Sequence, residues 1–323
     1  MRIVFMGSPE FAVPCLRALA SHHDVALVVS QPDKRAGRGS QMKVPAVKVA
    51  ASELGLPVFQ PASAKTGELE HALKTSGAEL AVVVAYGKIL PPAVLTALPR
   101  GCINVHASRL PKYRGAAPIQ WAVILGDRET GISIMQLDEG LDTGPVLLDR
   151  VVPIDPEETA GELMARLAPV GAEVVLEAVR QLAAGTAQII PQDPSQATYA
   201  RILTKADGLI DFAQPAAAVA ARIRGVDPWP GAHAHLIAKT NAQPQLVKLF
   251  HASPAEHIGD TPPGHIVAIE KIGALIACDS GAVWVRELQL AGRKRMPAEQ
   301  LAAGRGIAVG DTLVTSTAPG MGV

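Results

Sequence analysis

An asparagine and a histidine two residues apart are the first side chains in this sequence that could carry chemistry. Asn104 and His106 alternate with the apolar Ile103 and Val105, so on a β-strand the two polar groups lie on one face. At the carboxyl end of a strand, an amide and a titratable imidazole stand where open α/β sheets bind their ligands. The alternative is a buried histidine whose hydrogen bonds are satisfied by the amide.

An acidic loop supplies a third candidate. The segment Leu137–Pro145 carries three acidic residues and two glycines between apolar runs. Gly140 and Gly144 would allow backbone conformations with positive φ, and Pro145 fixes the exit. A loop shaped so tightly around Asp142 is more than a hairpin needs. A plain hairpin turn with solvated carboxylates is the alternative, and the composition by itself favours it.

Two further loops have the composition of binding segments. Ser108–Gln120 contains two prolines and Gly115, with a helix expected near Pro118, and irregular loops at strand ends often form binding sites. Gln31–Ser40 combines glycines with basic residues and suits a phosphate backbone. An ordinary strand-to-helix connection and a solvated surface loop are the respective alternatives. The basic residues of the second loop are Lys34, Arg35 and Arg38, followed by Lys43.

The composition narrows the function classes. At 323 residues, 48% of them apolar, the chain can form one large domain or two ordinary ones with a sizeable core. A formal net charge of zero argues against a protein that binds nucleic acid over its whole surface. A nucleic-acid partner would therefore have to bind at a local basic patch. Only 3% of the residues are aromatic, which argues against a stacking platform for single strands.

The N-terminal sequence and the cysteines indicate a soluble, cytoplasmic protein. The chain enters a strand-like run at once, and it has no apolar run long enough to cross a bilayer. Cys15, Cys102 and Cys278 are scattered and odd in number, which suits a reducing compartment and neither a disulfide framework nor a zinc site. We therefore expect no metal and no membrane partner.

The turn Gly7–Ala12 bears on whether the chain is a nucleotide-binding protein. It follows a strand and opens a helix, but it lacks the G-x-G-x-x-G pattern of dinucleotide sites. Pro9 and Glu10 stand where a pyrophosphate needs backbone N–H groups and no negative charge. This argues against a nucleotide-dependent oxidoreductase. A non-catalytic binding module on the same fold is a further alternative.

The first half of the chain alternates short apolar runs with amphipathic stretches. The runs Ile3–Gly7, Val25–Ser30 and Leu80–Ala85 are typical of strands covered on both faces. The stretches Phe11–Ala20, Val44–Leu54, Glu68–Ser76 and Pro92–Leu98 have helical spacing. This order predicts an α/β fold, a doubly wound and mostly parallel sheet.

The second half changes character. Thr159 and Glu162 form a capping-box pattern before a helix that runs to about Leu182, with Gly185 as its stop. A helix is expected at about Pro215–Ile223. Short strands separated by turn residues then predict a small β-barrel. These strands are Ala234–Ile237, Leu246–Phe250, Gly264–Ile269, Leu275–Ala277, Val283–Leu288 and Thr312–Val314. The expected domains are 1–189 and 207–323, with 190–206 as a linker.

Several strings resemble one known family, the 10-formyltetrahydrofolate-dependent formyltransferases. Near the candidate site they are Cys102-Ile-Asn-Val-His106, Ser108-x-Leu-Pro111, Arg114-Gly-Ala-Ala-Pro-Ile-Gln120 and Gly140-Leu-Asp-Thr-Gly144. Elsewhere they are Gln31-Pro-Asp-x-x-Ala-Gly-Arg-Gly39, Val83-Val-Ala-Tyr-Gly-x-Ile-Leu-Pro91 and Pro228-Trp-Pro230. The resemblance covers essentially the whole chain, and the order and spacing of the strings make it specific. It implies a Rossmann-like formyltransferase domain followed by an OB-like barrel.

The resemblance implies roles for the candidate catalytic residues. Asn104 would stabilise the oxyanion formed on the formyl oxygen, and His106 would donate to that oxygen or shuttle a proton. Asp142 would accept the proton of the attacking amine and orient His106; it would be a plausible base if partial burial raised its pKa towards neutrality.

The resemblance also implies a formyl donor, 10-formyltetrahydrofolate, and an acceptor, an aminoacylated initiator tRNA. Folate would lie on Ser108, Arg109, Leu110 and Pro111, with Ile89, Leu90 and Asp138 lining the pterin pocket. The family often has Leu where this chain has Arg109, so the part played by this side chain is open. The tRNA would contact Lys34, Arg35, Arg38 and Lys43, and the stretch Arg293, Lys294 and Arg295 on the barrel.

Two other formyltransferases of the same class, which act on different acceptors, are the alternatives. The purine-pathway formyltransferase lacks a second domain, so the length of this chain argues against it. A formyltransferase that acts on an amino sugar nucleotide can carry a barrel-like second domain and stays an alternative. We expect a monomer.

Overall fold

The computed structural model describes residues 1–36, 41–256 and 259–315, which form two compact units. The first unit comprises Met1–Pro118, Glu129–Pro153 and Met164–Ala200. The second comprises Ile119–Arg128, Ile154–Leu163 and Arg201–Val323. Residues 190–200 of the expected linker therefore lie in the first unit, and two segments from the first half of the chain belong to the second.

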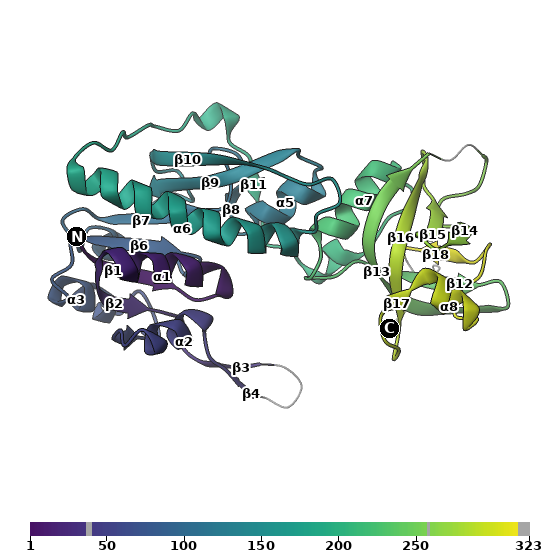
Figure 1. The fold of residues 1–323 in the computed structure, drawn as a ribbon, viewed down its shortest axis with the longest axis horizontal. Helices are drawn as coiled ribbons and strands as arrows, with labels where there is room; N and C mark the ends of the chain where they lie inside the picture. The colour runs from purple at the N-terminus through teal and green to yellow at the C-terminus, as the bar shows by residue number, and fades with distance from the viewer. Residues whose placement is uncertain (37–40, 257–258, 316–323) are drawn as a thin grey trace. The chain divides into compact units, whose positions relative to one another are not determined.

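A seven-stranded sheet forms the centre of the first unit, in the order β10-β9-β7-β6-β1-β2-β5 (Figure 1). Neighbouring strands are parallel from β5 to β7, and β9 and β10 extend the sheet in antiparallel register. The strands are β1 Arg2–Gly7, β2 Asp24–Val29, β5 Val58–Phe59, β6 Leu80–Val84, β7 Cys102–His106, β9 Glu129–Gln136 and β10 Val146–Pro153. The expected mostly parallel sheet is confirmed.

Helices cover both faces of this sheet, because alternate residues of its central strands are apolar on each side. On one face, Val4 of β1 and Val83 of β6 join a buried cluster with the helices α3 and α4. On the other face α6 approaches closely, since its Gly171 lies against Val105 and Cys15. The helices are α1 Val13–His22, α2 Ala46–Glu53, α3 Glu68–Thr75, α4 Pro92–Leu95, α5 Pro118–Ile124 and α6 Ala160–Ala184.

The two ends of α6 follow the sequence pattern. The Thr159 hydroxyl accepts from the Glu162 N–H, and the Glu162 carboxylate accepts from the Thr159 N–H, which is the predicted capping box. After Ala184 the chain leaves the helix through Gly185, whose φ is +70°. In contrast, neither strand of the hairpin β9–β10 was predicted from the sequence. Its connecting loop is the acidic segment Leu137–Pro145.

An antiparallel sheet forms most of the second unit, in the order β14-β15-β16-β13-β12-β18. A bridge between His265 and Thr312 joins its two ends, so the sheet closes on itself. The predicted OB-like barrel is thereby confirmed. Its strands are β12 His233–Ala238, β13 Asn241–Ala255, β14 Ile266–Glu270, β15 Gly273–Ala277, β16 Ala282–Leu290, β17 Met296–Pro297 and β18 Thr312–Val314, with helices α7 Ala216–Gly225 and α8 Ala298–Ala303.

Within the ranges given above, no helix is both long and apolar enough to cross a membrane.

Candidate active site

The end of β7 carries the first two predicted catalytic residues. Asn104 and His106 lie two residues apart, so they share the sheet face on which Cys102 joins the buried cluster of α3 and α4. His106 is only 5% exposed, whereas Asn104 is partly open to solvent. Among the described residues, the Asn104 side chain has no hydrogen-bond partner, which leaves its amide for a ligand.

His106 is held between a carbonyl and a carboxylate. Its Nε2 lies 2.9 Å from the Tyr113 carbonyl oxygen. A carbonyl only accepts, so Nε2 carries the hydrogen in this contact. The other ring nitrogen, Nδ1, lies 3.7 Å from Oδ2 of Asp142, whose side chain is 14% exposed. His106 and Asp142 therefore form a sheltered pair that can hold a proton between them.

Asp142 reaches this position through its own backbone conformation. Its φ is +51°, and its Oδ2 accepts a 2.8 Å hydrogen bond from the Gly115 N–H. The prediction that Gly140 and Gly144 supply the positive φ is wrong, since neither has one. They are glycines for space: a Cβ on Gly140 would collide with Thr143, and one on Gly144 with the backbone oxygen of Gln136.

Asp138 closes the same loop. Its Oδ1 accepts from the Gly140 N–H at 3.1 Å and from the Thr143 hydroxyl at 2.8 Å. An aspartate that accepts from its own loop two residues ahead stabilises a turn. In this structure Asp138 thus shapes the loop that presents Asp142.

The segment 108–111, predicted to bind folate, is tied to its surroundings largely through backbone groups. The Ser108 hydroxyl donates to the Lys112 carbonyl at 2.6 Å. Ser133 Oγ lies below the segment, donating to the Ser108 carbonyl and accepting from the Leu110 N–H. The turn therefore has a fixed shape, as a preformed binding segment requires.

Arg109 points to the antiparallel edge of the sheet. Its guanidinium pairs with Glu129 of β9 at 2.8 Å and with Asp149 of β10 at 3.5 Å. All three side chains are substantially exposed, so these pairs add little stability. They do direct the Arg109 side chain towards β9 and β10.

The two apolar residues predicted to line the pterin pocket differ in exposure. Leu90 is 8% exposed and belongs to the buried cluster, whereas Ile89 is 84% exposed. A bulky apolar side chain left this open is available for contact with a ligand. Pro111, the last residue of the folate segment, is partly buried.

The segment 190–200 completes the site, and the sequence analysis missed it. Gln192 donates to the carbonyl oxygens of Asp142 at 2.9 Å and of Gly144 at 2.7 Å. Its Oε1 accepts from the buried Arg114. The only signal in the sequence is Arg114, which stands in one of the matching strings; the segment around Gln192 has no periodicity that would reveal it.

The basic loop is framed by a short ribbon. Lys34–Ala36 (β3) pairs antiparallel with Gln41–Lys43 (β4), which sets Lys34 directly opposite Lys43. Both lysines are exposed. Arg38 and the Arg35 side chain lie outside the described residues. Neither lysine forms an ion pair with another described residue, and like charges that face each other across two strands are destabilising, so the ribbon favours an anionic partner.

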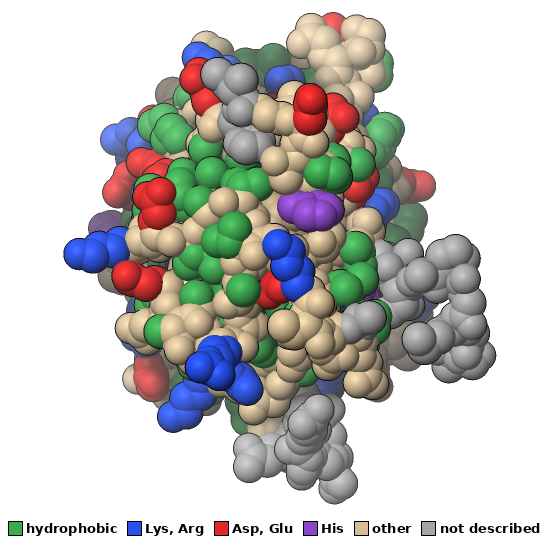
Figure 2. Space-filling view, turned by 90° about the vertical axis from the view of Figure 1, so that its right-hand side faces the viewer, with side chains coloured by type: hydrophobic (Ala, Val, Ile, Leu, Met, Phe, Trp, Pro, Cys, Tyr) green, Lys and Arg blue, Asp and Glu red, His purple; other side chains and the backbone are tan. Residues whose placement is uncertain are grey.

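The three basic residues Arg293, Lys294 and Arg295 of the barrel differ in their contacts. Arg293 and Lys294 are exposed, whereas Arg295 pairs with Glu287 at 2.8 Å and lies 4.0 Å over the Phe250 ring. Figure 2 shows a face on which Lys and Arg are interspersed with Asp and Glu around apolar side chains. Neither Arg293 nor Lys294 forms an ion pair with another residue that the structure describes, so their charges are open to a phosphate.

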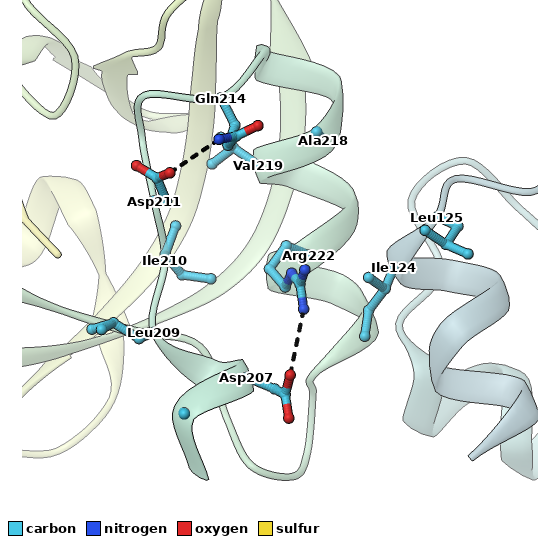
Figure 3. A pocket seen from close by; sticks show the side chains of 11 residues that line it. Ile124, Leu125, Asp207, Leu209, Ile210, Asp211, Gln214, Ala218, Val219 and Arg222 are labelled. Carbon is cyan, nitrogen blue, oxygen red and sulfur yellow. Dashed lines mark hydrogen bonds and ion pairs between the residues drawn. The ribbon is translucent and has the colours of Figure 1, made fainter. Parts of the chain in front are cut away.

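A separate cavity of about 510 Å³ lies in the second unit and is lined by none of the predicted site residues (Figure 3). Arg222 of α7 faces it and lies 3.9 Å from Asp207. Arg224, two residues on, is buried and donates to the Ala252 carbonyl at 2.8 Å. The two arginines thus face different partners, as their spacing on the helix predicts.

The three cysteines are free and buried. Burial raises the pKa of the Cys15, Cys102 and Cys278 thiols to about 12, so none is a thiolate near neutral pH. In the part of the chain that the structure describes, no three His, Cys, Asp or Glu side chains are grouped as a metal site would need.

Comparison with known proteins extends over both units. Residues 1–179 match the family described as Formyl transferase, and residues 202–306 match Formyl transferase, C-terminal domain. A methionyl-tRNA formyltransferase of Desulfotalea psychrophila is 45% identical over 317 residues, 98% of this chain and 96% of the relative. One of Sorangium cellulosum is 46% identical over 313 residues, 97% and 99% of the two chains.

A solved structure shares the fold at lower identity. The N-formyltransferase from Helicobacter canadensis, in complex with folinic acid and dTDP-3-aminofucose, has a TM-score of 0.65 at 17% identity, over 88% of this chain and 98% of that one. The family matches span both units, and His106 and Asp142, which stand in two of the matching strings, lie together at the end of β7. On this evidence, the chain belongs to the formyl transferase family.

Proposed function

We propose that this chain transfers the formyl group of 10-formyltetrahydrofolate to the amino group of methionyl-initiator tRNA. The observation that carries the proposal is the identity of about 45% to methionyl-tRNA formyltransferases over 98% of the chain, second unit included. The geometry at the end of β7 supports it, because the Asn104 amide, which has no partner among the described residues, lies beside a pair of proton acceptors.

Asn104 stabilises the charge that develops on the formyl oxygen. Its amide donates to this oxygen as the amine attacks, when the carbonyl becomes a tetrahedral oxyanion. Nε2 of His106 already donates to Tyr113, so this nitrogen fixes the ring and leaves the oxyanion to Asn104. The donor supplies an activated one-carbon group on nitrogen.

The pair His106–Asp142 moves the proton. As the amine nitrogen bonds to the formyl carbon, its proton passes to the pair, directly or through one water. The intermediate then collapses and the bond between the formyl carbon and the donor nitrogen breaks. The same proton leaves on that nitrogen, so the pair returns to its starting state.

The donor occupies the surface between Ile89 and the acidic loop in this proposal. Ile89 and Leu90 cover the face of the pterin ring, and the preformed segment Ser108–Pro111 offers backbone groups. Asp138 shapes the loop from beneath, and the Arg109 side chain stays with its two carboxylate partners.

The tRNA contacts the β3–β4 ribbon and the barrel. Lys34 and Lys43 face phosphates of the acceptor end, and Arg35 and Arg38 belong to the same basic segment of the sequence. Arg293 and Lys294 contact phosphates further along. The protein acts in the cytoplasm as a monomer.

A transfer assay tests the proposal. Purified protein is given 10-formyltetrahydrofolate with charged initiator tRNA, or with an amino sugar nucleotide as the competing acceptor. We expect formylation of the charged tRNA, with kcat/KM at least 100-fold higher than for the sugar nucleotide. A preference for the sugar nucleotide would replace the proposed acceptor with the alternative one, and no transfer to either would overturn the proposal.

A further inference from the structure

We infer that Gln192 is a positioning residue that holds Asp142 in its proton-accepting position, and that Arg114 orients Gln192 for this task. The inference rests on the proposed function for the reaction in which Asp142 acts. It assigns a role to a segment that contributes no group to the reacting atoms themselves.

The Gln192 amide bridges the backbone on both sides of Thr143. Its Nε2 donates to the carbonyl oxygens of Asp142 at 2.9 Å and Gly144 at 2.7 Å. Asp142 adopts a φ of +51°, which a residue with a Cβ rarely takes without support. Both hydrogens of one amide group are thus used to hold the strained part of the loop.

Arg114 determines which way the Gln192 amide points. Its Nε and Nη2 donate to Gln192 Oε1 at 3.1 and 2.8 Å. Arg114 is only 4% exposed, so its charge is not shared with bulk solvent. A guanidinium donates only, hence the amide oxygen must face it and the NH₂ group must face the loop. The reversed amide would set donors against donors.

The same two-residue strand holds the Asp142 carboxylate. Gly115 follows Arg114 in β8 (Arg114–Gly115), and its N–H donates to Oδ2 of Asp142. Asp142 is therefore tied through its carboxylate to Gly115 and through its backbone, by way of Gln192, to Arg114. A shift of β8 or of Gln192 would change the distance from Asp142 to His106.

Gln192 itself sits in a segment that is fixed at both ends. Ile190 exchanges backbone hydrogen bonds of 2.8 and 2.9 Å with Val146, at the exit of the acidic loop. Tyr199–Ala200 (β11) pairs in parallel with β8. Gly115 allows this pairing, because a Cβ there would lie 2.7 Å from the Ala200 oxygen. The amide is thus presented from a rigid frame.

Gln192→Glu tests the inference. The carboxylate still accepts from Arg114, but an acceptor now faces two carbonyl oxygens. We expect kcat to fall about 10- to 100-fold, as for other residues that orient a functional group, while KM for charged tRNA changes less than about 2-fold. Gln196→Glu is the matched control, since the exposed Gln196 lies in the same segment and its amide donates to Asp193 and to no other described residue.

A double variant separates positioning from a general structural role. If Gln192 acts through Asp142, adding Gln192→Glu to Asp142→Asn should cost less than about 2-fold more in kcat. Gln192→Met, of similar length and without hydrogen bonds, replaces Gln192→Glu if the latter does not fold. The inference is overturned if the wild type is active and the Gln192 substitution leaves kcat unchanged. It is also overturned if the losses in kcat of the two single variants multiply in the double variant. A wild type without formyl transfer instead overturns the proposed function.

Discussion

The imidazole of His106, at the end of β7, and the carboxylate of Asp142, in the loop between β9 and β10, face each other at 3.7 Å, and Nε2 of the imidazole is committed to the Tyr113 carbonyl. Because Nε2 is used, only Nδ1 can exchange a proton with Asp142. The arrangement makes the two residues one proton-holding unit.

Removing the carboxylate from this pair should stop proton uptake. Asp142→Asn keeps a side-chain oxygen that can accept from the Gly115 N–H, so the loop should stay folded. We expect kcat for formyl transfer to fall about 10²- to 10⁴-fold, the range for loss of a general base. Steady-state kinetics with charged tRNA measures this, and circular dichroism checks the fold. Activity within about 3-fold of wild type would exclude Asp142 as proton acceptor.

Asn104→Ala removes the proposed oxyanion donor. The side chain makes no hydrogen bond to other described residues, so its loss should leave stability within about 0.5 kcal/mol of wild type. We expect kcat to fall about 10²- to 10³-fold with KM nearly unchanged, as when a single oxyanion donor is lost. Kinetics and thermal unfolding are measured on the same sample. A raised KM with normal kcat would assign Asn104 to ground-state binding instead.

The sequence predicted those parts of the site whose signal is local. Alternation alone placed Asn104 and His106 on one strand face, and the Thr159–Glu162 pattern located the start of α6. The β13 strand was predicted only for Leu246–Phe250, yet it runs from Asn241 to Ala255, because pairing with β12 extends its N-terminal end and pairing with β16 holds Pro254 and Ala255 in extended form. Tertiary pairing of this kind leaves no local pattern.

The acidic loop shows the same limit at the site. Its glycines suggested positive φ, but they provide room for Thr143 and Gln136, while Asp142 takes the unusual conformation. Gln192 lies in a segment whose prolines and polar residues are typical of a linker. Its function depends on Arg114 and on the loop carbonyls, which are distant in sequence, so no residue spacing could reveal it.

Lys34 and Lys43 should contribute to acceptor binding and not to chemistry. Replacing both with Ala removes two facing cations from the β3–β4 ribbon. For a tRNA acceptor, KM should rise and the slope of its logarithm against the logarithm of salt concentration should fall by about 2, one for each lost phosphate contact. Exposed Lys65→Ala is the control. An unchanged salt slope would show that the β3–β4 ribbon is not part of the tRNA interface.

Asp207 should make the stability of the second unit dependent on pH. Its side chain is 7% exposed; it accepts from Arg201 Nη1 at 2.9 Å and from the Thr204 N–H at 2.7 Å. The Arg201 guanidinium holds the pKa of this carboxyl far below its usual range, aided by Thr204. A carboxyl whose folded-state pKa lies below its unfolded value of about 3.9 contributes stability in full above that pH and loses it as the pH falls towards the folded-state pKa.

Asp207→Asn should therefore lower the free energy of unfolding at pH 7 by about 2 to 3 kcal/mol, since a buried acceptor of charged hydrogen bonds is lost. The deficit should shrink as the pH drops below about 4, where the wild type loses the same contribution. Urea titrations at pH 7, 4 and 3 measure both, with the exposed Asp260→Asn as control. A deficit that stays constant down to pH 3 would mean that packing of the Asp207 side chain, and not its charge, stabilises the turn around Thr204.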